Sequence, residues 1–178
     1  MLRLIAVILL CALPVSLAVP PEAQKAPTAP TRVAGRYSAS FTQQFAADVQ
    51  DTPGHSLAIG QGRGTNRNVG AGNYMDGAEI RMIQTEDLIQ GTGTAEGYTM
   101  FALVGDTTRQ RFTGKVNTTL APDKSLQITF AGRWSESGGT GRYRGLTGAG
   151  TYRGHFISPS EYMVEWEGEL SPAPAAPR

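Results

Sequence analysis

Apolar and polar residues alternate with a period of two along most of residues 35–170, and no stretch there has the 3.6-residue apolar period of a helix. In the clearest run, 162–170, nearly every second residue is apolar and glutamates fill most of the positions between them. This alternation predicts strands with one face toward a core and one toward water, because successive side chains of a strand point to opposite faces. Eight segments follow the pattern: 37–45, 55–62, 78–89, 95–104, 111–120, 126–134, 148–157 and 162–170.

The positions of the glycines favour a closed barrel over a sandwich of two sheets. The chain has 22 glycines in 178 residues, and turn pairs such as Pro53-Gly54 and Pro122-Asp123 separate the predicted strands. Several glycines fall on the inward face, where a strand that coils to close a small barrel tolerates them. These are Gly114, Gly132, Gly150, Gly154 and Gly168. We therefore predict an all-β domain at 35–170, an eight-stranded antiparallel barrel, with a two-sheet sandwich as the alternative.

The first eighteen residues, MLRLIAVILLCALPVSLA, have the pattern of a cleavable secretory signal peptide. Arg3 precedes an apolar run that is shorter than the about 20 residues of a membrane span, which disfavours an uncleaved anchor. Cleavage removes the only cysteine, Cys11, and leaves 15 basic and 15 acidic residues. We therefore predict a secreted or periplasmic protein with no membrane span after cleavage, and its neutral charge does not indicate nucleic-acid binding. The Pro/Ala-rich segment 19–34 and the tail 171–178 are predicted to be disordered.

The densest glycine stretch is SGGTGRYRGLTGAGTYRG, residues 137–154. It lacks the spacing of a dinucleotide-binding fingerprint, G-x-G-x-x-G, and it separates two alternating strands rather than opening a helix. We interpret it as a break after a strand that ends at Trp134, then a turn or a single helical turn, then the start of the next strand.

Together with the residues before it, this stretch resembles the GGTGxYxGxxGxGxY hairpin of the allene oxide cyclase barrel-like proteins, a group that also includes, more distantly, the dirigent proteins. The resemblance extends over roughly 36–170. It implies an eight-stranded antiparallel barrel with an apolar lumen, often assembled as dimers or trimers. In the plant enzymes a glutamate and a polar cluster hold a water near the bound epoxide.

Polar and aromatic residues on the inward face are the candidates for a binding site, because a buried polar group without a partner costs about 1–3 kcal/mol. The predicted ligand-binding residues are Tyr37, Gln43, Gln84, Tyr98, Trp134, Tyr152, Tyr162 and Trp166. Glu86 is the candidate for a catalytic acid or base, since its position in the alternation points it into the lumen. No metal site and no cofactor are predicted, because His55 and His155 are the only histidines and their spacing does not suggest a zinc site.

The favoured function is an exported, cofactor-free barrel that binds a small hydrophobic molecule in its lumen. The first alternative is a cofactor-independent cyclase or isomerase of the allene oxide cyclase or dirigent type. The second is a non-catalytic structural or interaction module with a filled core, since an eight-stranded barrel is only just wide enough for one small ligand. Whether the protein is an enzyme does not follow from the sequence.

Overall fold

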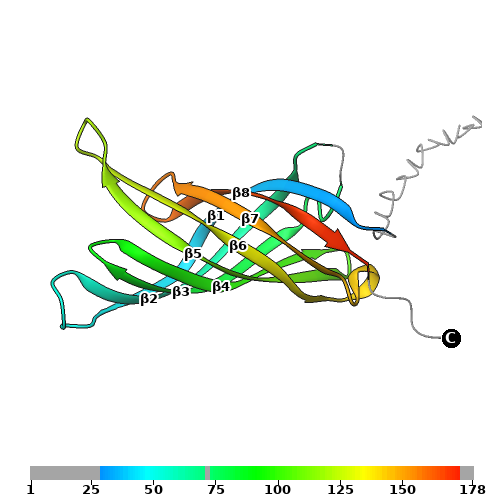
Figure 1. The fold of residues 1–178 in the computed structure, drawn as a ribbon, viewed down its shortest axis with the longest axis horizontal. Helices are drawn as coiled ribbons and strands as arrows, with labels where there is room; N and C mark the ends of the chain where they lie inside the picture. The colour runs from blue at the N-terminus through cyan, green and yellow to red at the C-terminus, as the bar shows by residue number, and fades with distance from the viewer. Residues whose placement is uncertain (1–28, 71–72, 173–178) are drawn as a thin grey trace, which may run out of the picture.

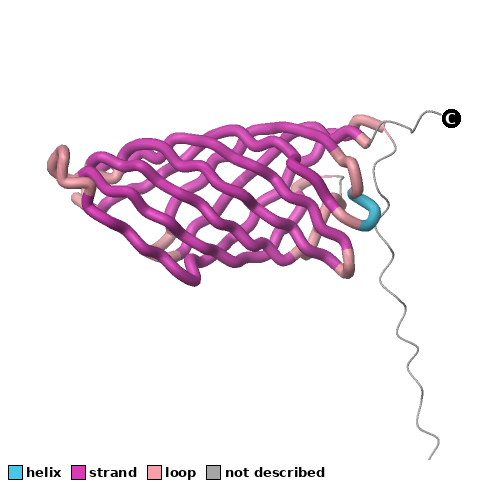
Figure 2. The backbone as a smooth tube through the Cα atoms, turned by 90° about the horizontal axis from the view of Figure 1, so that it is seen from below, coloured by secondary structure: helices cyan, strands magenta, loops and turns pink. Residues whose placement is uncertain are grey.

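The computed structural model describes residues 29–70 and 73–172, and most of this part of the chain is β-strand (Figures 1 and 2). The strands are β1 (Thr31–Asp48), β2 (His55–Asn68), β3 (Glu79–Ile89), β4 (Thr92–Leu103), β5 (Asp106–Leu120), β6 (Leu126–Gly139), β7 (Thr147–Phe156) and β8 (Glu161–Ser171). Each strand pairs antiparallel with the next, and β8 pairs with β1, so the sheet closes on itself. The predicted eight-stranded antiparallel barrel is confirmed.

The predicted terminal segments fall mostly outside the described residues. This applies to the signal peptide at 1–18, to most of the 19–34 segment and to the tail from residue 173. Because β1 begins at Thr31, the last four positions of the predicted 19–34 segment belong to the barrel. Within the described ranges, no helix has the length and hydropathy needed to cross a membrane.

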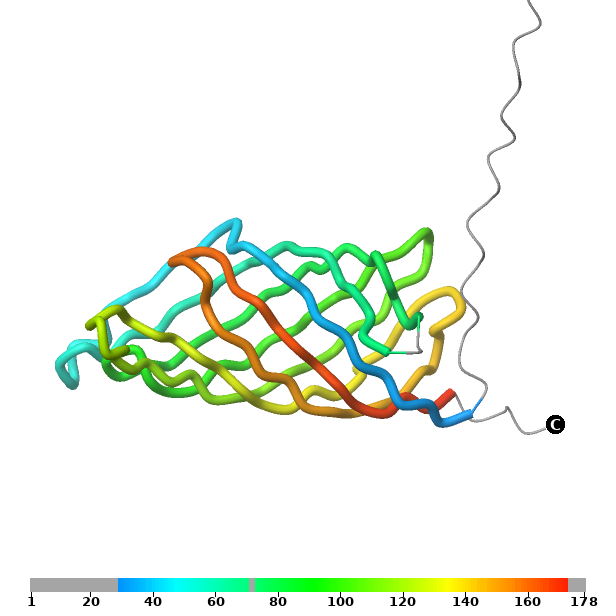
Figure 3. The backbone as a smooth tube through the Cα atoms, turned by 90° about the horizontal axis from the view of Figure 1, so that it is seen from above, coloured from blue at the N-terminus to red at the C-terminus, as the bar shows by residue number. Residues whose placement is uncertain are grey.

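The connections between strands alternate between the two ends of the barrel (Figure 3). One end carries the start of β1, the end of β8, and the connections β2–β3, β4–β5 and β6–β7. The other end carries four hairpin connections, at 49–54, 90–91, 121–125 and 157–160. We call these the terminal end and the hairpin end.

The glycine-rich stretch bends the chain at the terminal end, as predicted. It contains a short 3-10 helix, η1 (Gly141–Tyr143), whose Arg142 amide donates to Asp106 Oδ1 at 2.9 Å. Gly141 has a φ of 58°, and a Cβ there would collide with the Asp106 carboxylate, so glycine is required at this turn. The predicted end of the preceding strand at Trp134 is wrong, because β6 continues to Gly139.

Inward glycines make room for the aromatic rings of the core. A Cβ on Gly60 would lie 2.6 Å from the Phe41 ring, and one on Gly132 would lie 2.8 Å from the Tyr152 ring. Each ring therefore packs closely against the backbone at a glycine, where another side chain would crowd the lumen. This packing explains how a narrow barrel holds so many aromatic side chains.

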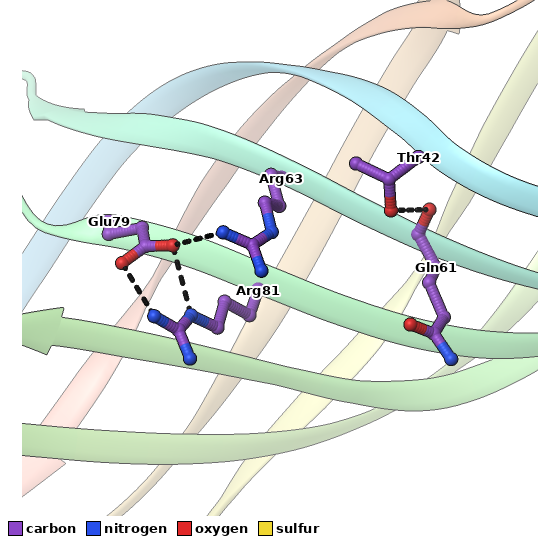
Figure 4. Close-up of polar contacts among 5 residues, drawn as sticks. All are labelled: Thr42, Gln61, Arg63, Glu79 and Arg81. Atoms are coloured by element: carbon purple, nitrogen blue, oxygen red, sulfur yellow. Dashed lines mark hydrogen bonds and ion pairs between the residues drawn. The ribbon is translucent and has the colours of Figure 1, made fainter.

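A β-bulge in β1 reverses which side chains face inward. Phe41 pairs with Gly62 and Gln43 pairs with Gln61, so Thr42 is the extra residue, and its hydroxyl donates to the Gln61 carbonyl at 3.1 Å (Figure 4). A bulge places two residues opposite one and shifts the alternation by one position. Beyond Thr42, therefore, Gln43 and Phe45 lie on the outer surface.

Candidate ligand-binding site in the barrel lumen

The half of the lumen at the terminal end is filled by side chains, and we call it the closed half. Tyr74 and Met75 from the β2–β3 connection and Tyr143 from η1 belong to the buried core there, each at most 5 % exposed. The centroid of the Tyr74 ring lies 6.3 Å from that of Phe101 and 6.0 Å from that of Trp166. These residues plug the barrel at this end.

The rest of the lumen, toward the hairpin end, contains a cavity, and we call it the open half. Seven of the eight strands contribute to its wall, which is mostly aromatic. The aromatic lining residues are Tyr37, Phe41, Phe112, Phe130, Trp134, Tyr152, Phe156, Tyr162 and Trp166. The free volume of the cavity is only about 50 Å³. The rings are therefore close together, with a narrow free space between them.

Two tryptophans separate the halves. Their rings meet edge to face at 6.2 Å, and both line the cavity while Trp166 also contacts Tyr74 in the closed half. Trp166 Nε1 donates to Asn66 Oδ1 at 3.1 Å, and Trp134 Nε1 donates to the Glu167 carbonyl at 3.2 Å. Both indole N–H groups are thus satisfied, which holds the rings in fixed orientations.

Glu86 is the carboxylic acid of the cavity wall, as its parity on β3 predicted. It lies opposite Ala58 and Ala95 on the neighbouring strands, and these small side chains leave space around it. Burial raises the pKa of its carboxyl, because the ionised form is poorly solvated there. Gln84 Nε2 donates to Glu86 Oε1 at 2.5 Å, so the amide orients the acid within the cavity.

Three tyrosines contribute hydroxyl groups to the same space. Tyr162 is buried, and its hydroxyl has no hydrogen-bond partner. Burial raises the pKa of both Tyr162 and Tyr37, and that of Tyr152 to about 12, so all three stay neutral at physiological pH. The Tyr37 hydroxyl has a partner in Thr99. The open half therefore contains one buried hydroxyl that lacks a hydrogen bond.

Seven of the nine predicted site residues line this cavity. They are Tyr37, Gln84, Glu86, Trp134, Tyr152, Tyr162 and Trp166. The structure brings them together in one space, and their role in binding remains a prediction.

The predicted inward positions of Gln43 and Tyr98 are wrong. Gln43 lies outside because of the bulge at Thr42. Tyr98 is 52 % exposed and lies directly opposite Ile83 on the outer surface. Apolar residues occur on both faces of β4, so alternation alone did not show which face points inward. The buried Phe101 identifies the inward face, and Tyr98 lies on the other one.

Sequence reasoning missed a second buried acid, Glu136, at the closed half. Its Oε1 accepts a hydrogen bond from the Arg109 amide at 2.9 Å, and its Oε2 accepts one from the Tyr74 hydroxyl at 3.4 Å. Burial raises the pKa of this carboxyl to about 8, although both hydrogen bonds act in the opposite direction. Glu136 could have been predicted if the strand had been extended beyond Trp134, because a residue two positions further along points to the same face.

The histidines occupy surface positions. His55, at the hairpin end, lies between two carboxylates: Nδ1 is 2.5 Å from Asp51 and Nε2 is 2.9 Å from Asp87. Both contacts raise the pKa of the His55 imidazole, and the contact with Asp51 has the larger effect. Among the described residues, no group of three or more His, Cys, Asp or Glu side chains could hold a metal ion.

Comparison with known proteins gives only distant structural matches. No protein-family model and no curated protein matches the sequence. Two solved structures of pterocarpan synthase dirigent proteins resemble the chain. GePTS1 is 11 % identical, with a TM-score of 0.47, over 85 % of this chain and 91 % of that one. PsPTS1 is 14 % identical, with a TM-score of 0.43, and the match covers 83 % of this chain and 98 % of that one. At these values the matches carry no argument about activity or ligand, and membership of the allene oxide cyclase group remains a prediction.

Proposed function

We propose that the open half of the lumen binds a small, mainly apolar molecule that carries one hydrogen-bonding group. The observation that carries the proposal is the buried Tyr162 hydroxyl, which lacks a partner inside an aromatic cavity. A buried polar group in this condition costs about 1–3 kcal/mol, and a ligand that bonds to it would recover part of that cost. Apolar walls with a few convergent polar groups are typical of small-molecule sites.

The narrow free space restricts the shape of such a ligand. Small-molecule pockets usually measure about 300–1,000 Å³, whereas the free volume here is about 50 Å³. A flat molecule that slides between rings, with small shifts of Phe112 and Phe156, fits this geometry best. Gln84 and Glu86 would then meet its polar end.

The test begins with native mass spectrometry of the protein purified from its own host, followed by extraction and identification of any bound molecule. Titration with the identified molecule, or otherwise with a panel of flat lipophiles, would follow through the fluorescence of Trp134 and Trp166, which border the cavity. We expect Tyr162→Phe to weaken binding about ten-fold, in line with one lost hydrogen bond. Tyr98→Phe, the same chemical change on the outer surface, is the matched control. No binding by any compound would overturn the proposal and favour the structural module with a filled core.

A cofactor-independent cyclase or isomerase is the second candidate, and Glu86 is the observation that favours it. A carboxyl whose pKa is raised by burial can donate or accept a proton at a working pH where an exposed one stays ionised. Turnover of the bound molecule that is lost in Glu86→Gln but kept in Glu96→Gln, an exposed acid on β4, would establish this role. Binding without turnover would restrict the protein to the binding function.

Export belongs to the same proposal and rests on the N-terminal sequence. We propose that a signal peptidase cleaves after Ala18 and releases the barrel to the periplasm or the medium. N-terminal sequencing of the exported protein should begin at Val19. An intact N-terminus on a membrane-bound product would support the anchor alternative.

A further inference from the structure

Four arginines lie close together on the outer surface of β1, β2 and β3. Arg36 is directly opposite Arg67, and Arg63 is directly opposite Arg81. Directly opposite residues of an antiparallel pair have Cβ atoms about 5 Å apart, and like charges in these positions repel. The barrel therefore carries two like-charged cross-strand pairs on one face.

One carboxylate contacts one of the two pairs. Glu79 Oε1 lies 3.4 Å from the Arg63 guanidinium and accepts a hydrogen bond from Arg81 Nε at 2.9 Å, while its Oε2 accepts one from Arg81 Nη2 at 3.0 Å (Figure 4). All three side chains are largely exposed, and Arg63 is the most exposed at 62 %. A single negative charge thus serves two guanidinium groups.

Arg36 and Arg67 form no ion pair with any residue in the described ranges. The acid opposite Arg36 on β8 is Glu165, and its carboxylate is 2.8 Å from Arg153 instead. The guanidinium groups of Arg36 and Arg67 are therefore open to a ligand.

Three of these arginines, Arg36, Arg63 and Arg67, border a shallow, open hollow of about 700 Å³ on the outside of the barrel. Between them lie hydroxyl groups, since Ser38 is directly opposite Thr65, and Ser40 is directly opposite Arg63. The lining includes one carboxylate, Glu161, at the end of the hollow beside Ser40. We call this hollow the arginine groove.

We propose that the arginine groove binds an acidic polysaccharide, a linear glycan that carries carboxylate or sulfate groups. A guanidinium forms paired hydrogen bonds with such groups, and the serine and threonine hydroxyls match the hydroxyls of a sugar chain. Arg63 and Arg67 are four residues apart on one strand, about 13 Å. A polymer with charges spaced along its length can contact both. The groove lies outside the lumen, so this inference is independent of the proposed lumen function.

The groove is poorly suited to nucleic acid. Single-stranded nucleic acid is held largely by bases that stack on exposed aromatic rings. The tyrosines of the lining, Tyr37 and Tyr162, are both buried and face the lumen. The groove therefore offers charges and hydroxyls without a stacking platform.

The experiment measures binding of the purified protein to polygalacturonate and to dextran sulfate by isothermal titration calorimetry, with uncharged dextran as the blank. We expect binding of a charged polymer at low ionic strength, weakened by salt, and no binding of dextran. The double variant Arg36→Gln/Arg67→Gln should lose affinity about ten-fold or more, because two charge-assisted contacts are removed. Its thermal unfolding should be unchanged or slightly improved, since a like-charged pair is relieved.

The matched control is Lys115→Gln/Arg133→Gln, which removes the same charge from the outer surface of β5 and β6. This control should keep its affinity for the polymers. Equal losses in both double variants would show that net charge alone matters, and would overturn the proposal. The same holds if the wild-type protein binds neither polymer, or if a DNA oligonucleotide or anionic vesicles bind more tightly with the same dependence on Arg36 and Arg67.

Discussion

The closed and open halves of the barrel are built from the same eight strands, yet one is solid and the other contains a cavity. In the closed half, connections between strands fold inward and contribute Tyr74 and Tyr143 to the core. In the open half, none of the four hairpin connections lines the cavity. The strands supply the walls, and the connections determine whether an end is filled.

The halves differ in the hydrogen bonding of one tyrosine hydroxyl each, although side-chain atoms of Asn68 and Arg142 at the terminal end also lack partners. The Tyr74 hydroxyl of the closed half donates to Thr108 Oγ1 at 2.7 Å, within a network that reaches Glu136. The Tyr162 hydroxyl of the open half has no partner. A buried hydroxyl without a partner beside a cavity indicates a place where a ligand could bind, whereas the Tyr74 hydroxyl has no hydrogen bond left to offer one.

The largest expected difference is in packing. Phe101→Ala, at a fully buried position of the closed half, should lower the free energy of unfolding by about 3–5 kcal/mol. Phe156→Ala, in the partly buried wall of the open half, should cost about 1–2 kcal/mol, because less surface is removed from a tight environment. Urea denaturation at one pH measures both. Equal losses would mean that the two halves are equally well packed.

The pH dependence of stability should come largely from the closed half. Because the pKa of Glu136 in the folded protein is about 8, above the ordinary value of 4.5, folding favours its protonated form. The free energy of unfolding should therefore fall by about 4–5 kcal/mol as the pH rises between those values, since each pH unit contributes about 1.4 kcal/mol. Glu136→Gln should remove this slope, which urea denaturation across the pH range would reveal. Parallel pH profiles for the variant and the wild type would contradict a buried neutral acid.

The same tyrosine-to-phenylalanine change should have opposite signs in the two halves. Tyr74→Phe removes a hydrogen bond and should lower the free energy of unfolding by about 1–2 kcal/mol. Tyr162→Phe removes a buried hydroxyl that has no partner and should raise it by about 1 kcal/mol. Thermal unfolding of the ligand-free proteins compares the two. Destabilisation by Tyr162→Phe would show that its hydroxyl is bonded in solution.

The smallest effect is expected outside both halves. Tyr98→Phe, on the exposed face of β4, should change the free energy of unfolding by less than about 0.5 kcal/mol, with no change in ligand affinity. The measurements are those used for Tyr162→Phe. A loss of ligand affinity in Tyr98→Phe would mean that binding occurs on the outer surface rather than in the lumen.

Much of the site could be predicted from alternation alone. Glu86 and Gln84 share the parity of Ile80 and Met82 on β3, and all four point inward. Local alternation was sufficient here because β3 has no bulge along its pairing with β2 or β4. In a strand without a bulge, alternate positions in the sequence lie on the same face of the barrel.

Two kinds of residue escaped this reasoning. Gln43 escaped it because the bulge at Thr42 is defined by pairing with β2, which lies about twenty residues away in the chain. The arginine groove escaped it because its members are dispersed along the sequence and become neighbours only through strand register. Both depend on long-range pairing, which a single strand does not encode.

The sequence by itself determined the strands and most of their inward and outward faces, and it favoured the closed barrel, because period-two alternation and turn residues act locally. It also placed Glu86, Tyr162 and both tryptophans on the inward face. Only the tertiary structure decided which end is plugged, which hydroxyl lacks a partner and where the arginines gather. These features arise from contacts between segments far apart in the chain, and their energies depend on burial and register that exist only once the barrel has closed.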